Sequence, residues 1–386
     1  MTISEQASAR KFPPFSLTGL LRSTFAPTPG QKVCVLIDLA DPRDIIDFKF
    51  LQDPALTIQH NAITHFYEGL KKGTLADLEL QGGEIFAYQI TGGSNLDLPD
   101  LAIALDGREL SLEKDIYRNY DIILCISTYS ATAPLTAHAK IFGFRGATLH
   151  GLNPVILSSG LAVNYDDVSR DAEKMRLGMT VADWAEIDFQ LDSGTHTLRL
   201  ELDRQEAQKS HGLCRGTEPD VANLPAGEIY FVPTGASGTF PLKYEDDTLG
   251  LMRVAEGRIQ SAELLTGNAN TIRLHNEKLA SDPVTGELGE LGFGTQILPV
   301  SGRDIQDEKI RGTVHVATGR SDHLGGALTP EKFSNHQNAT HDDILFAPHK
   351  TPEILVTQVR LHRNGETQII IENYQPSSYV TDLIAG

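Results

Sequence analysis

The chain has 386 residues, more than the roughly 250–300 at which single hydrophobic cores stop growing, so we expect two domains. Its 40% hydrophobic and 22% charged residues exclude a disordered or fibrous protein. With 33 basic and 51 acidic residues, the formal net charge of -18 disfavours nucleic acid or an anionic membrane surface as a partner. Such an acidic excess serves solubility, with a site for metal ions or a substrate ammonium group as the alternative.

The opening residues 1–10 are polar and precede two prolines, so we expect neither a signal peptide nor a membrane span. The three cysteines, Cys34, Cys125 and Cys214, are odd in number and far apart in the sequence. Two of them fall inside apolar, strand-like runs. The pattern predicts buried, reduced thiols and a cytoplasmic protein.

In the first half of the chain, buried strands alternate with helical stretches. Short apolar, β-branched runs predict strands at residues 33–38, 84–88 and 120–126. Helical spacing covers about residues 45–72, with a break near Pro54. This order predicts an α/β domain with an open, mainly parallel sheet over residues 1–190.

A polar stretch with helical spacing, residues 163–184, is expected to lead out of that domain as a hinge helix. Beyond it, alternation with period two and frequent Gly, Pro and Asp indicate strands. The clearest of these are residues 197–202, 229–232, 358–362 and 368–371. We therefore predict a β-rich (α+β) domain over residues 191–386, and we expect it to carry the chemistry.

Histidines are concentrated in the last third of the chain, with carboxylates nearby, as in divalent metal sites. His341 and Asp343 stand two residues apart, so in a strand both side chains project from the same face. His315 lies among small and β-branched residues, where a hydrogen-bonded core histidine is the alternative. Because a His-x-Asp pair arises easily by chance, metal-binding and structural roles both remain open.

Two acidic segments add candidates. Residues 286–295 place Glu287 and Glu290 among four glycines, which predicts tight turns that hold a carboxylate at a bend. A plain β-turn with solvated acids is the alternative, and a phosphate loop is excluded because no Lys-Ser/Thr ending follows. Glu228 opens an apolar, strand-like run after a Leu-Pro pair, where an exposed acid is the alternative.

Together and in this order, the motifs resemble the thermophilic-type metallo-aminopeptidases, the leucyl aminopeptidase and aminopeptidase T group. The matching residues are Glu228, Glu290, His315, His341 and Asp343. The resemblance implies that these five bind two adjacent divalent ions, zinc, cobalt or manganese. A shared water would then cleave the N-terminal bond of a small peptide or amino-acid amide. It also implies a homodimer.

One position departs from that family, because Asp322 stands where the family has a tyrosine, with His323 beside it. Asp322 can still bind a metal ion or a substrate ammonium group, but it replaces a phenol poorly. General acid or base work is assigned to Glu287 or Glu308, the acids closest in sequence to the proposed ligands.

The motifs also resemble, more distantly, the iron-dependent dioxygenases that open dihydroxypyridine rings. That family has a histidine where Glu290 stands, followed by the His-x-Asp pair. The alternative function is therefore ring cleavage by a single ferrous ion on a hydroxylated pyridine or related aromatic. A third hypothesis is a non-catalytic accessory protein of the same fold.

Overall fold

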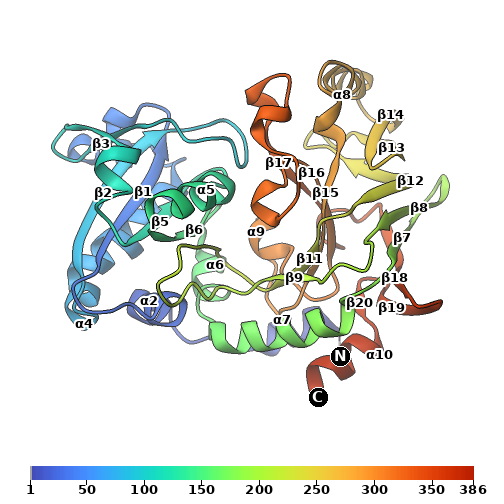
Figure 1. Ribbon diagram of the computed structural model, residues 1–386, viewed down its shortest axis with the longest axis horizontal. Coiled ribbons are helices and arrows are strands. Elements are labelled where there is room, and N and C mark those ends of the chain that lie inside the picture. Colours follow the sequence, from blue (N-terminus) through green and yellow to red (C-terminus); the bar gives the residue numbers. More distant parts are fainter. Residues whose placement is uncertain (1) are drawn as a thin grey trace. The chain divides into compact units, whose positions relative to one another are not determined.

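The computed structural model describes residues 2–386, and its chain forms two compact units (Figure 1). Unit 2 consists of Arg10–Ser169 and His211–Ala226. Unit 1 consists of the N-terminal residues up to Ala9, Arg170–Ser210 and Gly227–Gly386. The chain thus passes between the units several times, and the predicted boundary at residues 190 and 191 falls inside strand β7 (Trp184–Leu191) of unit 1.

Unit 2 is built on a seven-stranded mixed sheet with the order β10-β6-β5-β1-β2-β3-β4. The strands are β1 (Lys32–Leu39), β2 (Gln81–Gln89), β3 (Leu101–Ala104), β4 (Glu109–Ser111), β5 (Ile122–Ile126), β6 (Arg145–Thr148) and β10 (Val221–Asn223). Pairing is parallel from β10 to β2 and antiparallel from β2 to β4. Every residue of β5 is buried, as its continuous apolar run predicted. A mixed α/β fold is therefore confirmed.

The helices of unit 2 are short. They are α2 (Leu17–Phe25), α3 (Thr57–Asn61), α4 (Leu75–Asp77), α5 (Thr132–Phe142), α6 (Pro154–Ser158) and the start of α7 (Tyr165–Met179). The helical stretch predicted over residues 45–72 is present, with its break near Pro54: a 3-10 helix, Pro42–Gln52, precedes the break, and α3 with the π-helices Ala62–Tyr67 and Leu70–Thr74 follows it. Asp47 and Phe48 adopt positive φ inside the 3-10 segment, and this interrupts a regular helix.

Unit 1 contains two antiparallel sheets. The eight-stranded sheet has the order β14-β13-β12-β8-β7-β18-β19-β20, and the five-stranded sheet has the order β17-β16-β15-β11-β9. The strands not yet given are β8 (Gly194–Glu201), β9 (Gln208–Ser210), β11 (Glu228–Phe231), β12 (Gly235–Lys243), β13 (Leu249–Ala255), β14 (Arg258–Thr266), β15 (Leu288–Gly294), β16 (Val314–Gly319), β17 (His341–Phe346), β18 (Leu355–Arg363), β19 (Glu366–Glu372) and β20 (Gln375–Pro376). Helices α1 (Ile3–Ala9), α8 (Ala269–Ser281), α9 (Asp304–Asp307) and α10 (Ser378–Ala385) complete the unit. The predicted β-rich texture is present.

The two sheets of unit 1 share one hydrophobic core. Phe189 of β7 and Phe346 of β17 pack with ring centroids 4.7 Å apart, and Phe240 of β12 lies edge-on to Phe346. The five-stranded sheet also contributes Phe231 and Val316, both fully buried. Because side chains alternate across a strand, the intervening residues of this sheet point away from the core.

The cysteines are free and buried, in agreement with the sequence prediction. Among residues 2–386, no helix combines the length and the hydropathy that crossing a bilayer requires.

Candidate metal centre

Strand alternation places the predicted ligands on one face of the five-stranded sheet. Cross-strand pairing sets Glu290 opposite Ala317, which in turn lies opposite Asp343, while Gly319 lies opposite His341. Directly paired residues share a face, so these carboxylates and this imidazole converge on the side away from the core. Strands β15, β16 and β17 run side by side in Figure 1.

A first group of ligand atoms consists of Glu290, His341 and Asp343, all within 4.8 Å of one another. His341 Nε2 lies 3.0 Å from Glu290 Oε2 and 3.3 Å from Asp343 Oδ1. His341 and Glu290 are buried, whereas the Asp343 side chain is 32% exposed. One side of this group is therefore open.

The orientation of His341 is set by the backbone. Its Nδ1–H donates to the carbonyl oxygen of Arg320 at 2.6 Å, because a carbonyl can only accept. The preceding residue, Gly319, has a φ of +87°, and a Cβ there would lie 2.3 Å from Thr340 O. With Nδ1 protonated, Nε2 carries the lone pair toward Glu290 and Asp343 in the neutral ring, as a metal ligand requires.

A second group consists of Glu228, Glu290 and His315. His315 Nε2 lies 3.4 Å from Glu290 Oε1 and 3.6 Å from Glu228 Oε2. Within the described part of the chain, His315 Nδ1 is buried with no hydrogen-bond partner. A third group, Glu308 with His315 and Asp343, overlaps both. The structure thus brings together six of the residues singled out from the sequence.

A buried lysine, which the sequence analysis did not single out, lies inside this cluster. Lys309 Nζ is 2.6 Å from Glu228 Oε2 and 2.5 Å from Glu308 Oε1, and its side chain is 1% exposed. In the sequence, Lys309 sits in a charged segment after Glu308 and looks like any surface lysine. Only the tertiary fold reveals its position.

The charges of the cluster perturb one another. Burial raises the pKa of Glu308 to about 8, partly offset by the Lys309 ammonium. Burial lowers the pKa of His315, but the hydrogen bond and charge of Glu290 outweigh it and raise this pKa to about 9. Burial likewise raises the pKa of Glu290, and the two histidines reverse this, leaving it well below its ordinary value. Strongly perturbed groups at one place are typical of functional sites.

The glycine-rich segment is a buried strand, so the prediction of tight turns there is wrong. Its glycines make room for neighbours instead: a Cβ on Gly292 would lie 2.1 Å from the His315 ring. A Cβ on Gly294 would lie 2.2 Å from Ile310 O, where the chain crosses next to Lys309. Sequence alone could not distinguish glycines needed for close packing from glycines needed for turns.

Two predicted residues lie outside all three ligand groups among residues 2–386. Glu287 precedes β15, and its carbonyl accepts from Gly319 N–H at 3.0 Å. Asp322 pairs with Arg320, with Nε–Oδ1 at 2.7 Å. A residue not predicted as a ligand, His323, stacks edge-on against His341 at 4.9 Å, and burial lowers its pKa well below the ordinary value.

A pocket of about 830 Å³ in unit 1 is partly lined by Asp343 and the neighbouring Thr318. Its walls include the apolar Ile259 and Ile344, and a Tyr244–His275 pair with Oη and Nδ1 2.7 Å apart. The size and the mixed lining suit a small organic molecule. Asp343, the partly exposed member of the first ligand group, is the candidate ligand that lines this cavity.

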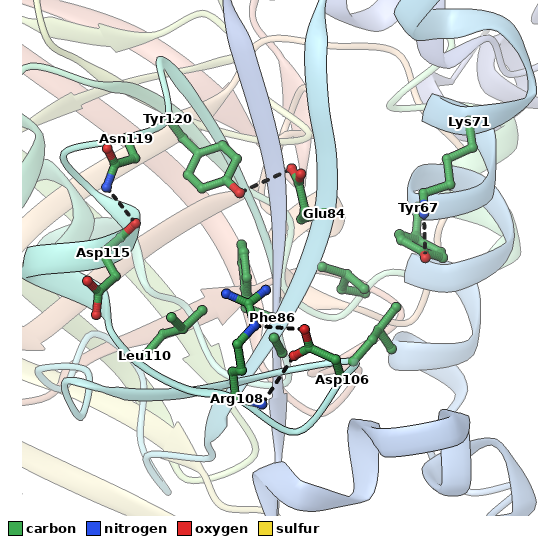
Figure 2. A pocket seen from close by; sticks show the side chains of 13 residues that line it. Tyr67, Lys71, Glu84, Phe86, Asp106, Arg108, Leu110, Asp115, Asn119 and Tyr120 are labelled. Atoms are coloured by element: carbon green, nitrogen blue, oxygen red, sulfur yellow. Dashed lines mark hydrogen bonds and ion pairs between the residues drawn. The ribbon is translucent and has the colours of Figure 1, made fainter.

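Unit 2 has a pocket of about 440 Å³ that contains none of the candidate ligands (Figure 2). Several of its polar side chains pair with one another: Arg108 pairs with Asp106, and Tyr120 donates to Glu84 at 3.1 Å. This pocket offers no comparable cluster.

Comparison with known proteins finds similarity to a solved structure and none to a family model. No protein-family model matches the chain, and no curated protein matches its sequence. Among solved structures, the chain is similar to a 2,5-dihydroxypyridine dioxygenase from Pseudomonas putida KT2440, with 13% identity and a TM-score of 0.56. The alignment covers 97% of this chain and 96% of the other, so the two share a fold over essentially their whole lengths.

The resemblance to metallo-aminopeptidases is therefore corrected: no family model matches the chain, and the solved structure that shares its fold over nearly the whole length is a dioxygenase. The physical reason lies in the sheet. The motifs follow one another in the order in which β11, β15, β16 and β17 place ligands on one face. Their order thus follows from the strand order of the fold, which different reactions can share.

Proposed function

We propose that this protein is a mononuclear, ferrous-ion-dependent dioxygenase that cleaves the ring of a hydroxylated pyridine or related aromatic compound. The observation that carries the proposal is the Glu290–His341–Asp343 group, in which Glu290 and His341 are buried and Asp343 lines a cavity. The whole-length likeness in fold to a 2,5-dihydroxypyridine dioxygenase supports it.

The donor atoms fit a hard divalent cation. Ring-opening iron sites commonly use two histidines and one carboxylate, which leave positions open on one face. Here Glu290 replaces one histidine, so the group offers one nitrogen and two carboxylates. Two carboxylates neutralise the charge of a divalent ion, which favours Fe²⁺ or Mn²⁺ over softer metals.

A ferrous ion bound there would supply the one-electron chemistry by which dioxygen and a closed-shell aromatic compound react. The residues of the chain supply orientation and shape. The Arg320 carbonyl holds the His341 ring in one tautomer, and Asp343 borders the pocket. Ile259 and Ile344 give that pocket apolar walls that would enclose a flat ring and exclude water.

The test is oxygen consumption by the protein reconstituted with Fe²⁺ under anaerobic conditions, then mixed with oxygen and a panel of dihydroxypyridines and catechols. We expect uptake with at least one compound, loss of ring absorbance, and abolition of both in His341→Ala. His336→Ala, at an exposed histidine, is the matched control and should retain activity.

The same panel includes aminoacyl arylamides, which test for hydrolysis. Hydrolysis by two ions would require the second ligand group to bind a metal ion as well. No oxygen uptake by iron-loaded protein with any ring compound would refute the proposal, and turnover of an arylamide would favour hydrolysis in its place.

A further inference from the structure

Two ligand groups that share Glu290 invite a two-ion centre, but a cation of the chain already lies beside the second group. The Lys309 ammonium contacts Glu228 Oε2 at 2.6 Å, and this oxygen also faces His315 Nε2 at 3.6 Å. A metal ion in this group would bind a carboxylate oxygen at about 2.0–2.2 Å. Ion and ammonium would then share one carboxylate and repel each other in a buried site.

The ammonium is held firmly in this place. The Lys309 side chain is 1% exposed, and its second partner, Glu308, is also buried. The backbone N–H of Lys309 donates to Gln306 O at 3.0 Å, and its carbonyl accepts from Gln296 N–H at 2.9 Å. A Cβ on Gly294 would lie 2.6 Å from the Lys309 carbonyl carbon, so β15 packs directly on this segment.

The first group differs in each respect. The Lys309 ammonium forms its ion pairs with Glu228 and Glu308, whereas Asp343 is partly exposed and lines the pocket. A metal ion can enter there without displacing an internal cation. The two groups are thus unequal, although residue types alone would make both plausible ligand sets.

We propose that the Lys309 ammonium is the permanent second cation of this centre, so that the protein binds one divalent ion, at Glu290, His341 and Asp343. Lys309 is a positioning residue: it neutralises Glu228 and Glu308 and keeps the Glu228–Glu290–His315 group free of metal. This inference rests on the proposed function in requiring that the first group binds an ion.

The test is the number of ions per chain, measured by elemental analysis after loading the full-length protein with excess Mn²⁺ and removing free metal. We expect one ion per chain, with the electron paramagnetic resonance spectrum of an isolated ion. In Lys309→Met, which keeps length but removes charge, we expect a second ion and an exchange-coupled spectrum. Lys309→Arg, the charge-preserving control, should stay at one.

Because Lys309→Met leaves two buried acids unpaired, Lys309→Met/Glu308→Gln provides a second variant with one fewer negative charge, and circular dichroism checks its fold. Glu228→Gln gives an independent readout. If Glu228 partners the lysine, this variant keeps one ion per chain with less than a twofold change in affinity. If Glu228 binds metal, it loses an ion.

The outcomes separate the two proposals. Two ions in the unmodified protein would overturn the role of Lys309 and leave ring cleavage open. One ion without oxygen uptake would support the role of Lys309 and count against the proposed function. No bound ion would overturn both.

Discussion

Replacing Gly292 by alanine should disrupt the packing of His315 in the candidate metal centre. Gly292 pairs directly with His315 across β15 and β16, and the new methyl carbon would lie 2.1 Å from two atoms of the imidazole. Such a contact cannot persist, so the buried His315 ring must move. Its contacts to Glu290 at 3.4 Å and Glu228 at 3.6 Å would then be lost.

The cost of Gly292→Ala follows from two contributions. Forcing an extra methyl group into a packed site costs about 1–3 kcal/mol. Leaving buried polar partners unsatisfied costs about 1–3 kcal/mol more. We therefore expect the free energy of unfolding to fall by about 2–6 kcal/mol, a large share of the stability of a typical domain.

Urea unfolding followed by the fluorescence of Trp184, the single tryptophan and a residue of unit 1, measures this change. Gly235→Ala in β12 is the matched control, since a Cβ there meets only Glu201 at ordinary contact distance, 3.5 Å. That variant should be neutral or more stable by about 0.5–1 kcal/mol. Equal stability of the two variants would refute the packing argument.

Three further predictions concern the ligands and their charges. His341→Ala should abolish tight binding of Mn²⁺ or Fe²⁺ in titration calorimetry, whereas His336→Ala should leave it unchanged; equal affinities would exclude His341 as a ligand. Metal at a hundredfold excess over its Kd should stabilise the folded protein by about 2.7 kcal/mol, seen as a rise in Tm that a chelator reverses; an unaltered Tm would argue against a structured site. In the metal-free protein, the free energy of unfolding should fall as the pH rises from about 6.5 to 9. In the folded state His315 has a pKa of about 9 and Glu308 a pKa of about 8, so both hold protons that the unfolded chain releases at lower pH. Urea unfolding across this range checks the slope, which should be shallower in Glu308→Gln; a slope of the opposite sign would contradict the assigned charges.

Hydrophobic patterns in the sequence predicted strands well where every residue of a run is buried. The apolar runs at β1 and β5 are strands because a β-branched stretch buried on both faces has few other conformations. The helical spacing over residues 45–72 correctly indicated helical segments on both sides of the break near Pro54. It carried no information on the positive φ at Asp47 and Phe48, which makes the first segment an interrupted 3-10 helix.

The candidate site was predictable in its residues and not in its chemistry. His341 and Asp343 share a face because they are two apart in a strand, as the sequence indicated. Lys309 could not be predicted, because its burial depends on Gly294 and on chain crossings distant in sequence. Without Lys309 the two ligand groups look equivalent, and a two-ion hydrolase follows naturally from the motifs.

The backbone hydrogen bond that orients His341 has an evolutionary consequence. Its acceptor is a main-chain oxygen, so no change of side chain at position 320 can remove it. The position that cannot vary is Gly319. Its φ is +87° and the structure leaves no room for a Cβ there, so only glycine fits. In homologues that keep the candidate metal centre, the hydrogen bond to His341 therefore places no restriction on the side chain at position 320. The residue immediately before it should remain glycine.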